Sequence, residues 1–348
     1  MHSGNMRVAW HADNYNPAMA SIRVRLIEPI GAMQRLGYDA DTYSPAVGPA
    51  GYDAVVFSKS FSSRSLGIAR QLRALGKCVV FDICDNIHQA KAGLGYRQKV
   101  ARFDEMLSLA THITCSTPIL AAQIAAVVPD VAAKMQVIPD ALDALPVVDR
   151  SSLGVFERHH LSRLERFIAR HPGALHCVWF GKSYGKIAGF SHLDRAVREL
   201  DRFSRHHPVT LSIISNERWR YWQSARRWAI PTAYMPWSIN SFRAALALHD
   251  VAIIPVEKND YTVGKTINRP ATAIMAGLGV VADAIDAYEE LRLFVSLDDW
   301  QGGLQLYAEA APATRAQLVS SRDYLDRTYG SEAIGRRWSE FLSGAVGK

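Results

Sequence analysis

Short apolar runs alternate with amphipathic stretches along most of the chain. Runs rich in Val, Ile and Phe predict buried strands, and apolar residues spaced three or four apart predict helices. Up to residue 138 the predicted strands are 7–11, 38–43, 52–58, 77–84, 113–116 and 135–138, and the predicted helices are 22–36, 65–75, 95–110 and 118–127. Because strands that alternate with helices indicate a parallel sheet, this part predicts one complete Rossmann-like domain.

The alternation stops after residue 138 and then begins again. The stretch 139–173 contains Pro139, Pro146 and Pro172 and a polar helix at 156–169, so we interpret it as an interdomain connection. The next predicted strands are 176–180, 209–214, 232–234, 250–256, 280–283 and 293–295. The helices predicted with them are 191–203, 217–228, 239–248, 270–276, 300–310, 313–328 and 332–342.

The repeated pattern predicts an α/β fold with two Rossmann-like, doubly wound parallel-sheet domains that face a central cleft. The expected boundaries are an N-terminal domain at 1–145, a linker at 146–173 and a C-terminal domain at 174–312. We expect the closing helices at 313–348 to pack back toward the N-terminal domain.

Composition agrees with a globular protein of this size. The chain has 348 residues, of which 49% are hydrophobic and 21% charged. No apolar run reaches the roughly 18 residues that span a bilayer, and residues 1–7 lead into a strand rather than a signal peptide. The cysteines Cys78, Cys84, Cys115 and Cys177 form no C-x-x-C pair, which favours reduced thiols and a cytoplasmic protein.

The net charge of +7 is dispersed along the chain, and no nucleic-acid-binding motif accompanies it. We therefore expect no nucleic-acid partner. The stretch 217–228 mixes arginine with three tryptophans, and it has two interpretations. It is either a membrane-interface contact or an amphipathic helix that buries Trp222 on the sheet, and helical spacing favours the second. Peripheral contact at the inner membrane face stays an alternative to a purely cytoplasmic location.

The segment 250–283 is the most informative part of the chain. It predicts a strand, a polar loop, a helix with Pro270 in its first turn and a second strand. Ligands of open α/β sheets bind at the carboxyl ends of strands, and helix N-termini favour anions. This loop therefore predicts a diphosphate site, carried by Lys265, Thr266, Asn268 and Arg269. The alternative is a solvated basic loop before a capped helix.

Two glycine-lysine pairs resemble the end of a P-loop, namely Gly181-Lys182-Ser183 and Gly264-Lys265-Thr266. That motif needs an earlier glycine, and the corresponding positions hold His176 and Asn259. Neither segment therefore supports a nucleoside triphosphatase.

Three segments resemble a known family. Met135-Gln-Val-Ile-Pro-Asp-Ala-Leu-Asp143 is similar to a "vIPNGvD" domain junction, and Val178-Trp-Phe-Gly181 opens the second domain. Residues 250–281 are similar to "DvaliP…Ks.nr…A.a.G.pVva". In this order and spacing the chain resembles the GT-B fold glycosyltransferases, in particular glycosyltransferase family 4, over most of its length.

The resemblance implies a nucleotide-sugar donor held mainly by the second domain. It places donor contacts at Gly181, Lys182, Ser183, Asn216, Trp237, Lys265, Thr266, Asn268 and Arg269. Fixed cations can stabilise a diphosphate leaving group, so we expect a metal-independent reaction with no cofactor, the nucleotide sugar being a substrate. Trp237 is expected beside the base, with a core aromatic as the equal alternative.

The chain departs from the family at one place. Family 4 members usually carry two glutamates eight positions apart, and the matching positions are Gly264 and Thr272. Glu257 lies nearby but out of register. The contact that those glutamates make with the sugar or ribose therefore has no counterpart at these positions. Whether the reaction retains or inverts the configuration of the transferred sugar stays open.

The first domain is expected to bind the acceptor. His11 and Asp13 follow its first strand, and Asp85 and His88 follow its fourth. A general base must take the acceptor proton in an inverting reaction, and Asp13 is the first candidate, Asp85 the second, with His11 beside them. The alternative is that Asp13 caps a turn and His11 makes a polar contact.

Two arginines and one histidine complete the predicted acceptor side. Arg23 and Arg25 are expected to meet a phosphate on the acceptor or donor, with His88 near them. The alternative for the arginines is a solvated helix face.

These features together predict a glycosyltransferase that moves a sugar from a nucleotide sugar to a glycan or lipid-linked acceptor, in bacterial surface polysaccharide biosynthesis. The alternatives are a nucleotide-sugar epimerase or hydrolase on the same fold, and a catalytically inactive nucleotide- or glycan-binding protein.

Overall fold

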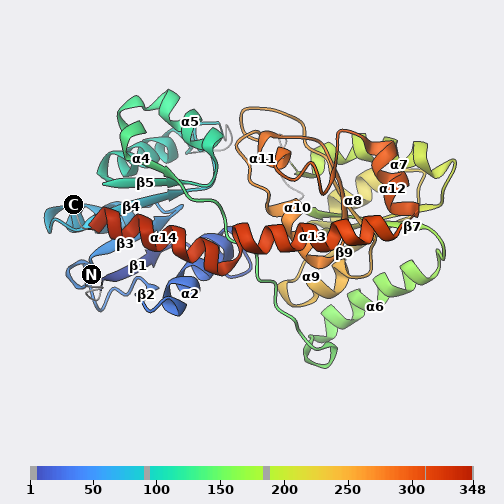
Figure 1. Cartoon of the computed structure of the whole chain (residues 1–348), viewed down its shortest axis with the longest axis horizontal. Coiled ribbons are helices and arrows are strands. Elements are labelled where there is room, and N and C mark those ends of the chain that lie inside the picture. Colours follow the sequence, from blue (N-terminus) through green and yellow to red (C-terminus); the bar gives the residue numbers. More distant parts are fainter. Residues whose placement is uncertain (1–5, 90–94, 183–188, 310, 347–348) are drawn as a thin grey trace. The chain divides into compact units, whose positions relative to one another are not determined.

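A computed structural model describes residues 6–89, 95–182, 189–309 and 311–346 (Figure 1). The chain divides into two compact units, and each unit is discontinuous in sequence. The first unit is Met1–Asp143, Val263–Thr266 and Leu325–Lys348, and the second is Ala144–Thr262 and Ile267–Tyr324.

The first unit is built on a six-stranded parallel sheet with the order β2-β1-β3-β4-β5-β6. Its strands are β1 (Arg7–His11), β2 (Asp39–Thr42), β3 (Ala54–Ser58), β4 (Cys78–Ile83), β5 (His112–Cys115) and β6 (Met135–Val137). Every residue of β3 and β4 is buried, because helices cover both faces of the sheet. This is why these strands read as continuous apolar runs rather than alternating ones.

Helices cover the two faces of this sheet separately. The helices are α1 (Ala20–Ile22), the π-helical turn η1 (Arg23–Ile27), α2 (Glu28–Arg35), α3 (Ser63–Ala74), α4 (Tyr96–Leu109) and α5 (Pro118–Val127), with short turns η2 (Pro49–Gly51) and η3 (Pro129–Lys134). Leu72, Phe103 and Ile124, from α3, α4 and α5, belong to one core cluster. Leu26, Ile30 and Met33 belong to a second cluster. The chain therefore changes faces between the helix after β1 and the helix after β3.

The last described helix, α14 (Ser331–Val346), completes the second of these clusters (Figure 1). Trp338 of α14 is fully buried and lies edge-on to Trp10 of β1, with 5.5 Å between ring centroids. Such an aromatic pair adds about 0.5–1.5 kcal/mol beyond the burial of apolar area. A Cβ at Gly335 would lie 2.9 Å from the Cβ of Ala32, so glycine permits the close approach of α14 to α2.

The second unit contains another six-stranded parallel sheet, with the order β12-β11-β10-β7-β8-β9. Its strands are β7 (Leu175–Gly181), β8 (Val209–Ser215), β9 (Thr232–Pro236), β10 (Val251–Ile254), β11 (Gly279–Ala282) and β12 (Ser296–Leu297). Its helices are α6 (Val155–Ala169), α7 (Leu193–Ser204), α8 (Arg218–Ala225), α9 (Ile239–Leu246), α10 (Asn268–Ala276), α11 (Asp286–Glu289), α12 (Trp300–Glu309) and most of α13 (Pro312–Tyr329), with turns η4 (Arg150–Ser152) and η5 (Gly189–His192).

Strand order fixes where a ligand is expected in each unit. The direction of winding reverses between β1 and β3 in the first sheet and between β7 and β10 in the second. Open α/β sheets bind ligands outside the carboxyl ends of the strands at such switch points. The helix α10 enters the second of these regions, beginning at Asn268 with Pro270 in its first turn and ending at Gly277, whose φ is 93°.

The prediction of two Rossmann-like parallel sheets is confirmed, and two local predictions are wrong. Residues 293–295 are not a strand: Leu293 is largely exposed, and the strand is β12 at Ser296–Leu297. In α8 the residue that packs on the sheet is Tyr221, while Trp222 lies at the surface.

Candidate functional site

The carboxyl end of β7 and the first turn of α10 lie together at the switch point of the second sheet. A terminal nitrogen of the Arg269 guanidinium is 3.4 Å from the position that a Cβ on Gly181 would take. Arg269 is therefore beside the last residue of β7, at the N-terminus of α10, where unpaired amides already favour an anion.

The backbone of Lys182 is held in the same region. Gly189 has a φ of 76°, and a Cβ on it would lie 2.7 Å from the Lys182 carbonyl oxygen. Only glycine adopts this backbone conformation at such a close approach without strain. The side chain of Lys182 is exposed, and Ser183, predicted to lie beside it, falls outside the described residues.

His192 is a buried imidazole at this switch point, with a side chain that is only 4% exposed. Its Nδ1 accepts a hydrogen bond of 3.2 Å from the backbone N–H of Glu257, just after β10. Burial lowers the pKa of His192, Glu257 opposes this, and Arg269 adds to the lowering. The neutral ring then carries its proton on Nε2, and the nearest carboxylate oxygen, of Glu257, lies 3.8 Å from it, beyond hydrogen-bond distance. A buried donor of this kind needs an acceptor, such as a phosphate oxygen.

The other predicted donor residues of the second unit lie at the ends of neighbouring elements. Asn216 is exposed and follows β8, and Asn268 is the first residue of α10. Trp237 follows β9 and is half-buried, with its backbone N–H donating to the Ser215 carbonyl at 2.8 Å. The centroid of its ring lies 6.1 Å from that of Phe242, so the indole packs against this aromatic side chain.

Lys265 and Thr266, also predicted to contact the donor, belong to the first compact unit. Lys265 forms an ion pair with Asp85, and the hydroxyl of Thr266 donates to Asp140 at 3.0 Å. The hydroxyl of Thr117 donates to the carbonyl of Gly264 at 3.1 Å. This pair therefore belongs to the first compact unit, whereas Arg269 belongs to the second.

Asp85 binds a second cation, Lys59, the residue directly after β3. Lys59 has a φ of 51°, an uncommon left-handed conformation for a residue with a side chain. Burial alone would raise the pKa of Asp85, but Lys265 and Lys59 outweigh it and hold that pKa well below its usual range. A carboxylate this acidic is a weak base, which argues against Asp85 as the group that takes a proton.

Asp13 is occupied by hydrogen bonds at the start of α3. One carboxylate oxygen accepts from the backbone N–H groups of Phe61 and Ser62, both at 2.9 Å. The other accepts from the hydroxyls of Ser62 and of Ser65, the latter at 2.6 Å. Burial alone would raise the pKa of Asp13, and the hydrogen bonds from Ser62 and Ser65 outweigh it and lower that pKa. The carboxylate thus accepts the four bonds that its lone pairs allow, as a structural cap does.

His11 is joined to Asp13 through one serine. Its Nε2 lies 2.9 Å from the Ser65 hydroxyl, and its ring packs edge-on against Tyr43 and Phe57. Burial lowers the pKa of His11, so the ring is neutral near pH 7. His11 and Asp13 therefore lie together, at the switch point of the first sheet, but in a fully bonded arrangement.

The three predicted acceptor contacts are largely buried and bonded to other residues of the first unit. Arg25 is 1% exposed, pairs with Asp82 and Asp140 and donates to the Ile138 carbonyl at 2.6 Å. It is not part of a solvated helix face, and its role as an acceptor contact stays a prediction. The pKa of Arg25 is raised above its usual value because its two carboxylate partners outweigh the effect of burial.

Arg23 and His88 are enclosed in the same way. The Nε and one terminal nitrogen of Arg23 donate to the two carboxylate oxygens of Asp143, each at 2.7 Å, and the other terminal nitrogen donates to the Pro17 carbonyl. The Nε2 of His88 lies 2.7 Å from a carboxylate oxygen of Asp104. Their expected role at the acceptor is therefore not supported by their burial and partners.

Sequence reasoning missed His192 and Lys59. Each had a signal, because Lys59 directly follows a predicted strand and His192 lies at the start of the helix after the first strand of the second sheet. Both residues lie at the carboxyl ends of strands next to a switch point, where ligands of such sheets bind. The sequence alone does not give the strand order, so it does not show that these strands border the switch point.

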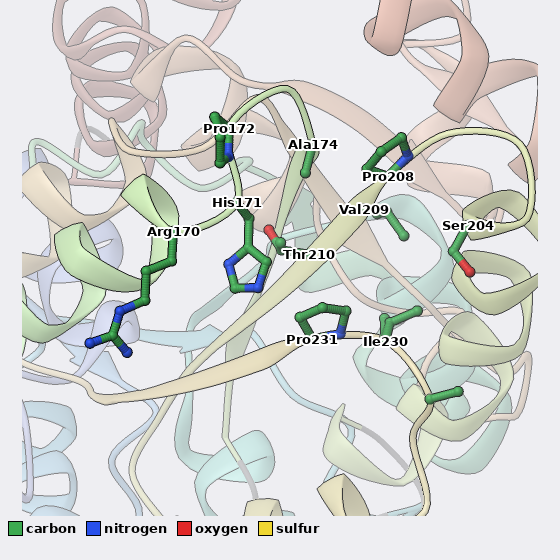
Figure 2. Close-up of a pocket in the computed structure, with 11 residues that line it drawn as sticks. Arg170, His171, Pro172, Ala174, Ser204, Pro208, Val209, Thr210, Ile230 and Pro231 are labelled. Carbon is green, nitrogen blue, oxygen red and sulfur yellow. The ribbon is translucent and has the colours of Figure 1, made fainter.

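A hollow of about 500 Å³ in the second unit lies away from these residues. Figure 2 shows Pro172, Pro208 and Pro231 around it, together with Val209 and Ile230. Val209 is the first residue of β8, so the hollow lies at the amino ends of the strands, opposite to the end where such sheets bind nucleotides.

Two searches for particular residue arrangements gave no result in the described ranges. No helix there combines the length and apolarity needed to cross a bilayer. No group of three or more His, Cys, Asp or Glu side chains is arranged there to hold a metal ion.

Comparison with solved structures identifies the fold. No protein-family model matches the chain, and no curated protein matches its sequence. A glycosyltransferase from Rickettsia africae superposes with a TM-score of 0.63 at 10% identity, covering 98% of this chain and 99% of that one. HepE from Anabaena, solved in complex with UDP and glucose, gives 0.62 at 11% identity, covering 97% and 99%. WaaG, a glycosyltransferase involved in lipopolysaccharide biosynthesis, gives 0.54 at 14%, covering 97% and 100%. The chain therefore has the GT-B fold.

Proposed function

We propose that the protein is a glycosyltransferase that uses a nucleotide-sugar donor, a relative of family 4 without the paired glutamates. The observation that carries this proposal is the convergence of Arg269, His192 and the Lys182 backbone at the switch point of the second sheet. HepE, of similar fold, holds UDP and glucose, which supports a nucleoside diphosphate sugar as donor.

The reaction breaks the bond between the sugar C1 and a phosphate oxygen and forms a bond from C1 to an acceptor oxygen. Negative charge grows on the departing diphosphate, and Arg269, Lys182 and the amides of the first turn of α10 would stabilise it. The Nε2–H of His192 would donate to a phosphate oxygen.

The acceptor proton needs a destination, and neither candidate carboxylate is well suited to take it. Asp13 accepts four hydrogen bonds, and two lysines hold the pKa of Asp85 low. We therefore propose that the proton passes to an oxygen of the leaving diphosphate. The acceptor is proposed to be a glycan or a lipid-linked sugar, as in bacterial surface polysaccharide synthesis, a setting in which the similarly folded WaaG acts.

The test is turnover of a panel of nucleoside diphosphate sugars by purified protein, with release of the free nucleoside diphosphate as readout. Wild type should release it, and Arg269→Ala should lose about 10²-fold or more in kcat/KM, the usual cost of removing an electrostatic group from a transition state. Arg198→Ala, on the exposed side of α7, is the control that should leave turnover unchanged. Neither turnover nor a melting shift with any member of the panel would contradict the proposal.

An inactive nucleotide-binding protein is the second candidate. Two observations favour it. The carboxylates of Asp13 and Asp85 are already bonded to other residues, and Gly264 and Thr272 stand where the family has its two glutamates. It predicts melting shifts with nucleoside diphosphates that Arg269→Ala abolishes, but no product with any sugar or acceptor.

A further inference from the structure

The helix α8 presents two tryptophans to solvent. Trp219 is 61% exposed and Trp222 is 44% exposed. Tyr221 faces inward instead, with its hydroxyl 3.0 Å from that of Thr232 and its ring 5.4 Å from that of Tyr234. Tyr221 therefore anchors the helix on β9, and the two indoles lie largely toward solvent. Exposure of two such large side chains on one turn is unusual for a surface without a partner.

Positive charge surrounds these indoles. Residues 217–228 contain four arginines and one glutamate. The guanidinium of Arg218 lies 4.5 Å from the centre of the Trp222 ring, a cation–π contact. Arg220 and Arg227 pair with carboxylates. Arg218 and Arg226 are exposed and form no salt bridge with any described carboxylate.

A second element with the same chemistry adjoins α8. The helices α6 and α8 both contact the edge strand β9. Near its N-terminus α6 exposes Phe156, at 80%, together with His159 and Arg163. Burial lowers the pKa of His160 on α6, and His159, Arg163 and Arg218 of α8 lower it further. The exposed aromatic and basic residues of these two helices flank one edge of the second sheet and are called the α6/α8 surface: Phe156, His159, Arg163, Arg218, Trp219, Trp222 and Arg226.

We propose that this surface binds the headgroup region of an anionic lipid bilayer. Tryptophan prefers the boundary between water and acyl chains, where its ring is desolvated and its N–H stays bonded. Arginines beside it gain from the negative surface potential of acidic lipids, by about 1 kcal/mol each. A nucleic acid is the other anionic partner that the arginines would attract, but it offers no apolar environment in which Phe156 could be buried. The combination of exposed rings and cations on the ends of two helices is that of an interfacial contact.

The experiment is co-sedimentation with vesicles. Wild type should bind vesicles of phosphatidylcholine and phosphatidylglycerol, bind vesicles of phosphatidylcholine alone much less, and be released by added salt. Tryptophan emission should move to shorter wavelength on binding. The double variants Trp219→Ser/Trp222→Ser and Arg218→Gln/Arg226→Gln should each lower the partition constant by about tenfold or more, since each removes two interfacial groups.

Controls with the same chemistry exist elsewhere in the second unit. Leu293→Ser removes another highly exposed apolar side chain, and Arg198→Gln removes another exposed cation. Both should bind vesicles as wild type does, and far-ultraviolet circular dichroism should show all variants folded. The proposal is overturned if both double variants bind like wild type, or if wild type binds a polyanion such as transfer RNA but not the acidic vesicles. Because no step of the test uses a sugar donor, its outcome is independent of the proposed enzymatic function.

Discussion

The ammonium group of Lys265 is bound by the carboxylate of Asp85, which also binds Lys59. The family resemblance assigns Lys265 to the donor, and the position of Asp85 after the fourth strand made it a candidate base. In the structure the charge of this lysine is therefore neutralised by that aspartate. If Lys265 serves the diphosphate, it does so by exchanging one anionic partner for another. The relation of these two residues is the first thing to test.

Lys265→Met and Lys59→Met separate the two roles. Each variant removes one cation from Asp85, and each should lower the free energy of unfolding by about 1–3 kcal/mol, the usual value for a hydrogen bond to a charged group. Only Lys265→Met should also lower kcat/KM, by about 10²-fold, because the family resemblance assigns Lys265, and not Lys59, to the donor diphosphate. Equal loss of turnover in both variants would mean that Lys265 acts through Asp85 alone.

Asp13→Asn tests whether the first candidate base is a structural cap. An amide has one acceptor oxygen and cannot receive the four bonds from Phe61, Ser62 and Ser65, so stability should fall by about 2–5 kcal/mol. Since the pKa of Asp13 is lowered in the native state, wild-type stability from this group is present above the unfolded value of about 3.9 and is lost as pH falls through the native pKa. Chemical unfolding across this pH range should show that the variant lacks this part of the acid sensitivity.

The kinetics of the same variant distinguish a cap from a base. A folded Asp13→Asn protein should keep more than about a tenth of wild-type kcat, whereas loss of a general base costs about 10²–10⁴-fold. A large loss of kcat with unchanged stability would restore Asp13 to the catalytic role.

His192→Phe tests the buried imidazole through pH. In the free protein the pKa of His192 is lowered, so its protonation costs folding free energy once pH falls below the unfolded value of about 6.5. A bound diphosphate favours the protonated ring. Each phosphate of a nucleotide sugar has one ester and one anhydride bond, so its single negative charge does not change near neutral pH. The KM for the donor should therefore fall as pH is lowered from about 8 to 6 in wild type, and much less in His192→Phe. His160→Phe, on α6, is the control, and the same pH dependence in all three proteins would exclude His192 from the donor site.

Gly335→Ala and Gly344→Ala make one substitution at two places on α14. A Cβ at Gly344 meets nothing within 4 Å, so alanine there should add about 0.5–1 kcal/mol through helix propensity. At Gly335 the new Cβ would lie 2.9 Å from that of Ala32, and the overpacking should cost about 1–3 kcal/mol. Thermal unfolding should show shifts of opposite sign, and two increases in Tm would show that α14 can move away from α2.

The elements of both sheets were largely predictable because buried parallel strands read as unbroken apolar runs. The strand Arg7–His11 and the helix Pro118–Val127 have the predicted bounds, and α10 has Pro270 in its first turn and a left-handed Gly277 at its end. In α8 the prediction failed by one position, between Trp222 and Tyr221. Both are aromatic, and one residue rotates the helix by about 100°, so the pattern alone did not decide which one faces the sheet.

The partners of the candidate site residues were much harder to predict than their positions. Lys265 and Asp85 are 180 residues apart, and Asp13 is 52 residues from Ser65. Position after a strand places a side chain at the carboxyl edge of a sheet, but the strand order decides which side chains meet there. For this reason the sequence placed Asp13, Asp85 and Arg269 at the carboxyl edges of the two sheets, where the structure has them, without showing which of them is already fully bonded.

The discontinuity of the two compact units has a consequence for how the chain reaches its native state. The helix α14 covers one face of the first sheet, yet a ribosome makes it only after the whole of the second unit. Until then Trp10, Leu26 and Met33 lack the partners that bury them, so the nascent N-terminal half keeps an apolar face open during translation. A fragment that ends before α14 should accordingly aggregate or be bound by chaperones, whatever the quality of its first six strands.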